Sequence, residues 1–193
     1  MVVDSRAVLL NLLTRHAYRR AEPGKPFRLA SGATSEEYLD CRQALGMASA
    51  KRALGRLGLA ELRPEVQAVG GLTLGADPVS NAVVHESAGG RELRAFWVRK
   101  AAKEHGRGRR IEGPVEPGDR VCVVDDVVTS GGSTVQAVEA CREAGLRVVQ
   151  VLVVVDRQAG GLDAIRAAVG EEVPVEALFT LDEVRDAWDR VQG

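Results

Sequence analysis

The chain has 193 residues, of which 45% are hydrophobic and 27% are charged, and its formal net charge is −1. This length predicts a single domain with a substantial core, and the near-zero charge argues against nucleic acid or an anionic membrane as a partner. Aromatic residues make up 4% of the chain, which is few for stacking platforms that bind single-stranded nucleic acid.

Cysteine usage and the N-terminal sequence indicate the compartment. The three cysteines are odd in number and show no CxxC spacing, which favours a reducing environment over a disulfide framework. The first residues include Asp4 and lack the basic-then-apolar pattern of a secretory signal. No apolar run reaches the length of roughly 18 residues that a membrane helix needs. We therefore expect a cytoplasmic protein with no membrane partner.

The N-terminal part of the chain predicts short elements without a regular alternation. Apolar residues at helical spacing predict a helix over residues 5–20, which the sequence PGKPF then ends. Residues 27–32 and 36–40 predict two short extended pieces around a turn. Residues 46–59 are predicted to be helical. We expect residues 1 to about 45, named the hood here, to form a small subdomain over one edge of a sheet.

From residue 66 onward, a pattern of strand, Gly-rich loop and helix repeats. Alternating strands and helices predict an α/β fold with a mostly parallel sheet flanked by helices on both faces. The chain is therefore expected to be one domain, residues 1–193, with the hood followed by a core over about 46–193. Predicted strands cover residues 66–71, 93–100, 120–126, 146–157 and 175–180, and predicted helices cover 72–87, 135–145, 160–169 and 181–191.

Two adjacent carboxylates follow the apolar strand that begins at Val121, in the sequence VCVVDDVVTSGGST. Asp125 and Asp126 are predicted to lie at its carboxyl end, where open α/β sheets bind ligands. Residues 129–134 then supply hydroxyls, backbone N–H groups and a helix N-terminus, a combination that favours an anion. The alternative interpretation is a pair of aspartates that merely caps the next helix.

Spacing excludes two common phosphate-binding motifs. The GxxxxGK[ST] pattern is absent, and GGLTLGADP over residues 70–78 does not match GxGxxG. A sugar phosphate remains, with its hydroxyls on Asp125 and Asp126 and its phosphate on residues 129–134. Magnesium would relieve the repulsion between the carboxylates and the phosphates, because it binds few protein carboxylates and bridges substrate oxygens.

The sequence VCVVDDVVTSGGST resembles the signature of the type I phosphoribosyltransferases, which use phosphoribosyl pyrophosphate (PRPP). The resemblance implies the type I phosphoribosyltransferase fold and Mg²⁺ as cofactor, held mainly through PRPP, so no residue is assigned as a direct metal ligand. It also implies that the acidic pair contacts the ribose hydroxyls and that the loop holds the 5-phosphate. The PRPP-binding residues implied here are Asp125, Asp126, Val127, Val128, Thr129, Ser130, Gly131, Gly132 and Ser133.

Residues 98–113, VRKAAKEHGRGRRIEG, form a strongly basic segment. By itself this pattern is typical of a solvated surface loop or a nucleic-acid patch. The order Arg-Lys-x-x-Lys-x-His-Gly resembles the catalytic loop of the orotate phosphoribosyltransferases. That resemblance implies PRPP or pyrophosphate contacts from Arg99, Lys100, Lys103 and His105, and a homodimer whose subunits share active sites. Lys103, Arg99 and Asp126 are the implied catalytic residues.

Further segments concern the acceptor, the base that receives the ribose 5-phosphate group from PRPP. Residues 27–42 resemble the orotate-binding segment of the same family, which implies that Ser31 and Gly32 present backbone groups to the base. Ala30 stands where many members have lysine, and Thr73-Leu74 stand where some members have Tyr-Lys in the pyrophosphate loop. Arg157, together with Thr129, is implied to hold orotate.

The expected function is magnesium-dependent transfer of ribose 5-phosphate from PRPP to orotate, which gives orotidine 5′-phosphate in pyrimidine (UMP) biosynthesis. One alternative is another type I phosphoribosyltransferase that accepts a purine or uracil. The other is a PRPP-sensing regulator that has kept the fold without catalysis. A regulator of that kind usually needs a nucleic-acid-reading surface, and neither a positive net charge nor an extra domain is evident in the sequence.

Overall fold

The computed structural model describes residues 4–28, 34–101 and 110–192, and its central feature is a mostly parallel β-sheet. Within these residues the sheet has six strands in the order β10-β9-β8-β5-β6-β7, and only β7 runs antiparallel to its neighbour. The prediction of a mostly parallel sheet is confirmed. The strands are β5 (Ala68–Leu72), β6 (Arg94–Val98), β7 (Ile111–Glu112), β8 (Arg120–Val128), β9 (Arg147–Asp156) and β10 (Val175–Thr180).

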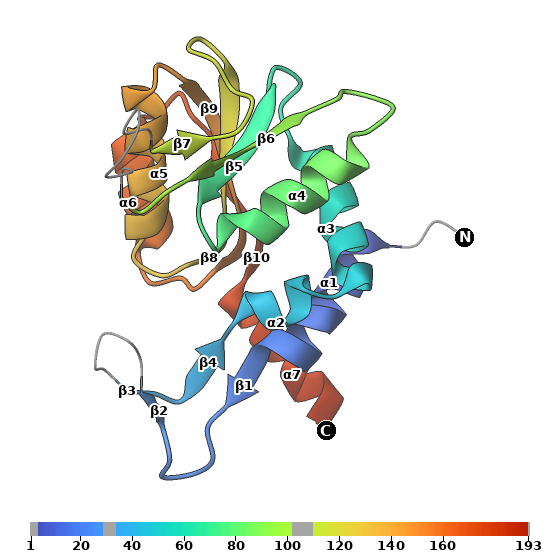
Figure 1. The fold of residues 1–193 in the computed structure, drawn as a ribbon. Helices are drawn as coiled ribbons and strands as arrows, with labels where there is room; N and C mark the ends of the chain where they lie inside the picture. Colours follow the sequence, from blue (N-terminus) through green and yellow to red (C-terminus); the bar gives the residue numbers. More distant parts are fainter. Residues whose placement is uncertain (1–3, 29–33, 102–109, 193) are drawn as a thin grey trace.

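The central strands are buried on both faces, as their continuous apolar sequences require. Along β8, Val121 and Val123 join one hydrophobic cluster, while Cys122 and Val124 join the cluster on the opposite face. Helices cover both clusters, so the sheet has no face in contact with solvent along its middle. Figure 1 shows α3 (Ala48–Glu61) and α4 (Ala76–Glu86) on one side of the sheet, and α5 (Gly132–Glu143) and α6 (Gly161–Val169) on the other.

β8 is longer than the sequence predicted. The expected strand ended with the aspartate pair at Asp126, whereas β8 continues to Val128 because its pairing with β9 continues to Val128 and Asp156. Asp125 and Asp126 therefore lie within a paired strand, and the backbone holds them at fixed positions. In this way the sheet itself orients the two carboxylates.

The N-terminal helix is shorter than predicted. α1 (Ser5–Leu12) continues into a π-helical turn (Leu13–Ala17), and the chain then becomes extended as β1 (Tyr18–Arg20). Pairing with β4 (Glu37–Leu39) and complete burial of Tyr18 against Trp188 outweigh the helical pattern there. The remaining elements of this region are β2 (Phe27–Arg28), β3 (Thr34–Ser35) and α2 (Cys41–Leu45), and α2 precedes the helix that was predicted over 46–59.

The strands of the hood lie beyond the end of the sheet where β8 ends, next to the C-terminal helix α7 (Leu181–Gln192) (Figure 1). Two ion pairs join the strands to that helix. Arg185 donates to both carboxylate oxygens of Glu37 at 2.6 and 2.8 Å, and Arg20 lies 2.8 Å from Asp189. The division into a hood over 1–45 and a core over 46–193 stays a prediction. Among the described residues, no helix combines the length and the apolar character needed to cross a membrane.

Replacing Glu37 with glutamine should destabilise the fold at neutral pH by roughly 1–3 kcal/mol, because charge-assisted hydrogen bonds are lost. Hydrogen bonds from Arg185 lower the pKa of Glu37 from 4.5 to about 2. An acid whose pKa is lowered by folding stabilises the protein above its unfolded pKa and loses that contribution as the pH falls through its folded pKa. The difference between the variant and the wild type should therefore shrink between pH 4.5 and about 2.

Urea unfolding at about pH 7 and about pH 3 measures this difference. The matched control is Glu22→Gln, because the ion pair of Glu22 with Lys25 is about three-quarters exposed and should contribute less than about 1 kcal/mol. A Glu37→Gln variant that is as stable as this control at neutral pH would contradict the role given to the ion pair.

Candidate active site

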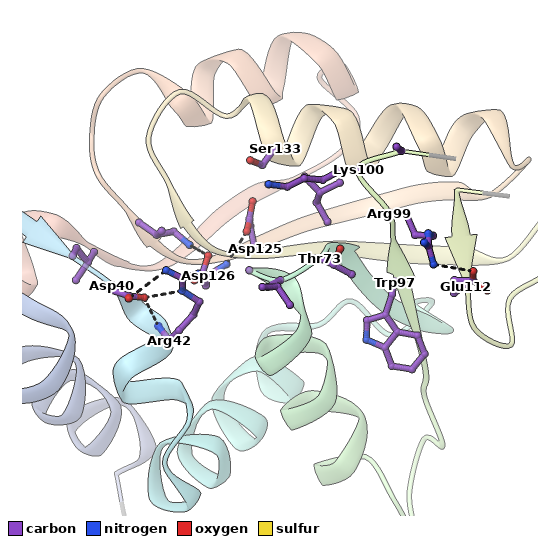
Figure 2. A pocket seen from close by; sticks show the side chains of 16 residues that line it. Asp40, Arg42, Thr73, Trp97, Arg99, Lys100, Glu112, Asp125, Asp126 and Ser133 are labelled. Atoms are coloured by element: carbon purple, nitrogen blue, oxygen red, sulfur yellow. Dashed lines mark hydrogen bonds and ion pairs between the residues drawn. The ribbon is translucent and has the colours of Figure 1, made fainter. Parts of the chain in front are cut away.

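A cavity of about 1010 Å³ opens at the carboxyl ends of β5, β6 and β8 and extends to the hood. Open α/β sheets bind their ligands at this edge. Figure 2 shows Asp125 and Asp126 in the middle, with Arg42 and Asp40 at one end and Arg99 and Glu112 at the other. The cavity is lined by Leu39, Asp40, Arg42, Leu72, Thr73, Leu74, Gly75, Trp97, Arg99, Lys100, Ala101, Glu112, Asp125, Asp126, Val127 and Ser133.

The two aspartates are almost entirely buried, with 5% of Asp125 and 7% of Asp126 exposed. Thr134 donates its hydroxyl to Asp125 Oδ2 at 2.9 Å, and the backbone N–H of Asp126 donates to Asp125 Oδ1 at 3.0 Å. The backbone N–H of Val127 donates to Asp126 Oδ1 at 2.9 Å. These bonds fix both carboxylates and leave acceptor capacity for a ligand, since each oxygen can accept more than one hydrogen bond.

Burial and mutual repulsion keep the pair from ionising easily. Desolvation, followed by the charge of Asp126, raises the pKa of Asp125 to about 7. Burial also raises the pKa of Asp126, although the charge of Arg42 opposes this effect. Two buried like charges side by side are costly, so the pair favours a ligand that donates hydroxyl groups or brings a cation.

A second, smaller cavity of about 120 Å³ lies beside the pair and is formed by the loop that leads into α5. Gly131 adopts φ +80° at the start of the helix, where a Cβ would lie 2.6 Å from the carbonyl oxygen of Gly161. No side chain caps α5, so its first N–H groups are available to an anion, as at other helix N-termini that bind anions. The lining residues are Asp125, Val127, Val128, Thr129, Ser130, Gly131, Gly132, Ser133 and Thr134.

The loop after β5 packs directly against the carboxylates. A Cβ at Gly75 would lie 2.6 Å from Asp125 Oδ1 and 2.7 Å from Asp126 Oδ1. Any side chain there would displace the pair, so this position requires glycine. Thr73 and Leu74, the two residues noted at the predicted pyrophosphate loop, line the large cavity next to it.

The basic segment begins inside the cavity. Arg99 and Lys100 follow β6 and line its wall, and Arg99 forms an ion pair of 3.6 Å with Glu112 of β7. A pyrophosphate that entered the cavity here could pair with the Arg99 guanidinium. It would have to compete with Glu112 for this cation. Lys103 and His105 lie outside the described residues, and their implied contacts remain predictions.

The structure does not place the residues that were predicted to bind the acceptor in one cavity. Ser31, Gly32 and Ala30 lie outside the described residues. Arg157 follows β9 and donates its backbone N–H to the carbonyl of Val128 at 2.9 Å, next to the phosphate loop. Its side chain is half-buried but lines neither cavity.

Sequence reasoning missed three polar groups of the cavity, namely Asp40, Arg42 and Glu112. Asp40 and Arg42 lie at the end of the segment 27–42 that was assigned to the acceptor, but neither was named as a site residue, so the charged pair Asp-x-Arg was a usable signal. Glu112 carried no such signal. It reaches the cavity because β7 pairs with β6 opposite Trp97.

Comparisons with known proteins identify the family. No protein-family model matches the chain. It is 46% identical over 184 residues to an orotate phosphoribosyltransferase of Corynebacterium glutamicum (strain R), an alignment that covers 94% of this chain and 95% of that protein. It is 43% identical over 191 residues to an orotate phosphoribosyltransferase of Thermosynechococcus vestitus, covering 98% and 97% of the two chains. The chain belongs to the orotate phosphoribosyltransferase family.

Solved structures agree with this assignment. Mycobacterium tuberculosis orotate phosphoribosyltransferase, in a complex with Fe(III) dicitrate, matches with a TM-score of 0.79 and 39% identity over 93% of this chain and 98% of that one. The same enzyme in complex with PRPP matches with a TM-score of 0.72 and 35% identity, covering 95% and 93%. The predictions of the type I phosphoribosyltransferase fold and of an orotate phosphoribosyltransferase are confirmed.

Replacing Asp125 with asparagine should stabilise the ligand-free protein above neutral pH by roughly 1–3 kcal/mol. Folding raises the pKa of Asp125 to about 7, and an acid with a raised pKa costs stability as the pH rises through that value. Asparagine can accept from the N–H of Asp126 and donate to the hydroxyl of Thr134, so both local bonds survive.

Thermal unfolding of the wild type and of Asp125→Asn across the range from about pH 4 to about pH 8 measures this effect. The gain should be several degrees in Tm at the alkaline end and should vanish near the acid end, where both side chains are neutral. A difference that does not change with pH, or a variant less stable than the wild type at about pH 8, would contradict the raised pKa.

Proposed function

We propose that this chain transfers the 5-phosphoribosyl group of PRPP to orotate, releasing pyrophosphate and forming orotidine 5′-phosphate in pyrimidine biosynthesis. The main support is the placement of the buried Asp125–Asp126 pair between the phosphate loop and the cations of one cavity. Each part of PRPP has a chemically matched surface there. The M. tuberculosis relative solved with PRPP bound adds support for this donor.

The donor is held at two points. The ribose hydroxyls donate to Asp125 and Asp126, and the 5-phosphate accepts from the N–H groups and hydroxyls of residues 129–134. Hydrogen bonds from these hydroxyls favour the ionised carboxylates, so PRPP binding lowers the raised pKa values and releases protons near neutral pH. Two fixed points orient the anomeric carbon before reaction, and this orientation supplies much of the rate acceleration.

Little covalent chemistry is required of the protein. The deprotonated ring nitrogen of orotate attacks the anomeric carbon while the bond to pyrophosphate breaks, through a state with positive charge on the ribose. Arg99 and Lys100 lie where they can stabilise the negative charge on the leaving pyrophosphate. Lys103 and His105, which follow in the same segment, are proposed to close over the pyrophosphate and to exclude water.

The site suits Mg²⁺ that arrives with PRPP. Asp125 and Asp126 are two buried carboxylates with raised pKa values, and a cation near them would relieve their repulsion. Among the described residues no group of three or more histidine, cysteine or acidic side chains is arranged to hold a metal. We therefore propose that the substrate supplies most of the ligands. When bound, the ion neutralises charge on the pyrophosphate.

We also propose that the enzyme is a cytoplasmic homodimer with shared active sites. Cys41, Cys122 and Cys141 are all buried and unpaired, which supports a reducing compartment. The basic segment starts at the cavity with Arg99 and Lys100, and a continuation that reaches a neighbouring subunit would place Lys103 in the partner's site. No nucleic acid or membrane partner is proposed.

A base-panel assay tests the reaction. The purified chain is mixed with PRPP, magnesium and orotate, uracil, adenine, guanine or hypoxanthine in turn, and pyrophosphate release is measured. Orotate should give the signal, and an Asp126→Ala variant should lose it by at least about 100-fold because one ribose contact is removed. Release with a purine or uracil instead would favour the other transferases. PRPP binding without any release would favour the regulator.

A subunit-mixing experiment tests the shared site. Lys103→Ala and Asp126→Ala homodimers should each be inactive, because they lack a leaving-group contact and a ribose contact respectively. Mixed dimers contain one site with both wild-type groups, so mixing should restore up to about one quarter of wild-type activity. Pyrophosphate release by the remixed proteins measures the recovery. No recovery, with exchange verified by mass spectrometry, would mean that each chain works alone.

A further inference from the structure

Glu112 is a carboxylate in the cavity that is proposed to hold pyrophosphate, and the proposed reaction gives it no task. The other acidic residues that line this cavity, within the described part of the chain, have a partner or a proposed ligand. Asp40 pairs with the arginine two residues later, and Asp125 and Asp126 are proposed to bind the ribose hydroxyls. Glu112 pairs instead with Arg99, which is proposed to contact the leaving pyrophosphate, as Figure 2 shows.

The pairing of β6 with β7 places Glu112 beside Arg99. Trp97 lies opposite Glu112 in the register of these antiparallel strands. The backbone N–H of Arg99 donates to the carbonyl of Arg110 at 2.8 Å, so the two chain segments stay together up to this residue. Side chains two residues apart on a strand share a face, so Arg99 is a diagonal neighbour of Glu112 and lies within reach of it. Backbone pairing therefore keeps this carboxylate next to this guanidinium.

The contact between the two side chains is loose. Arg99 Nη1 and Glu112 Oε1 are 3.6 Å apart, and the side chains are 46% and 38% exposed. Ion pairs with this much exposure are weak, because water and salt screen them. The guanidinium can therefore exchange Glu112 for an anion that accepts shorter, charge-assisted hydrogen bonds, as the oxygens of pyrophosphate do.

A carboxylate at this position works against tight binding of pyrophosphate. The incoming anion must displace Glu112 from Arg99, and afterwards the two negative groups remain near each other and repel. The same opposition acts on pyrophosphate when it is the product. Release of product limits the turnover of many enzymes, so a site that holds its product less tightly can turn over faster.

We infer that Glu112 competes with pyrophosphate for Arg99 and thereby speeds the release of this product. It acts through Arg99, so its effect falls on the affinity for pyrophosphate and not on the bond-breaking step. The inference rests on the proposed function, since it requires pyrophosphate as the leaving group. Two other roles for Glu112, positioning Arg99 for the ligand or binding the magnesium that accompanies pyrophosphate, require the opposite effect on affinity.

Titration calorimetry with pyrophosphate and magnesium tests the sign of the effect. Glu112→Gln keeps the size of the side chain and removes its charge, so it should bind pyrophosphate roughly 3- to 10-fold more tightly than the wild type. Most of this change should be a slower dissociation, as is usual among variants of one binding site. Ribose 5-phosphate lacks the pyrophosphate group, so its affinity should stay within about twofold. Product inhibition by pyrophosphate should strengthen by the same factor as its affinity.

The control is Glu143→Gln, because Glu143 forms an ion pair of the same length, 3.6 Å, with Arg110 and does not line the large cavity. Its affinities for both ligands should equal those of the wild type. A double-mutant cycle with Arg99→Gln tests the competition itself. In that background Glu112→Gln should give at most about half of the gain, because only the direct repulsion between the two anions remains.

Unchanged or weaker binding of pyrophosphate by Glu112→Gln would overturn the inference while the proposed function stands. An equal gain for ribose 5-phosphate, or an equal gain in the Arg99→Gln background, would do the same. A wild type that releases no pyrophosphate with orotate would overturn both.

Discussion

The site is organised around the burial of two neighbouring carboxylates inside a paired strand. Asp125 and Asp126 are less than one-tenth exposed, and the cost of burying them is expressed as raised pKa values. Fixed N–H and hydroxyl donors offset part of this cost, and a ligand with two adjacent hydroxyls would offset more. If this pair binds the ribose of PRPP as proposed, the burial that destabilises the ligand-free site also favours binding of the donor.

Several features around the Asp125–Asp126 pair follow from its burial. The sheet must be covered on both faces to exclude water from β8, and helices on either side do so. Gly75 has to lack a side chain because the carboxylates occupy that space. The opposite charges come from separate elements, with Arg42 on one side and Arg99 on the other. In the proposed reaction, this distribution of charge would stabilise an oxocarbenium-like state between two anions, since electrostatic stabilisation works best when the groups are in place beforehand.

Features formed by one continuous segment could be predicted from the sequence, whereas features that depend on contacts between distant segments could not. The valine-rich strands, the aspartate pair and the loop over residues 129–134 stand in continuous segments, so the core fold and a candidate donor site could be predicted. The end of β8 was placed too early because its length is set by pairing with β9, which lies elsewhere in the chain. Arg42 and Glu112 reach the cavity through α2 and β7, and short elements of this kind leave weak periodic signals.

The N-terminal region was the least predictable part for the same reason. Residues 18–20 continue a helical pattern, yet they form a strand because Tyr18 packs against Trp188 at the other end of the sequence. Arg157 illustrates the opposite case. Its position after β9 was correct, but a position in the sequence does not fix the direction of a side chain, and this one lines neither cavity.

The ion pairs between the hood and α7 have a consequence for synthesis on the ribosome. Glu37 is made 148 residues before its partner Arg185, and Arg20 is made 169 residues before its partner Asp189. The hood strands therefore cannot make these contacts until α7 has been synthesised, although the strands of the sheet can already pair. A chain that ended at Thr180 would keep every described strand of the sheet and would lack both ion-pair partners of the hood strands.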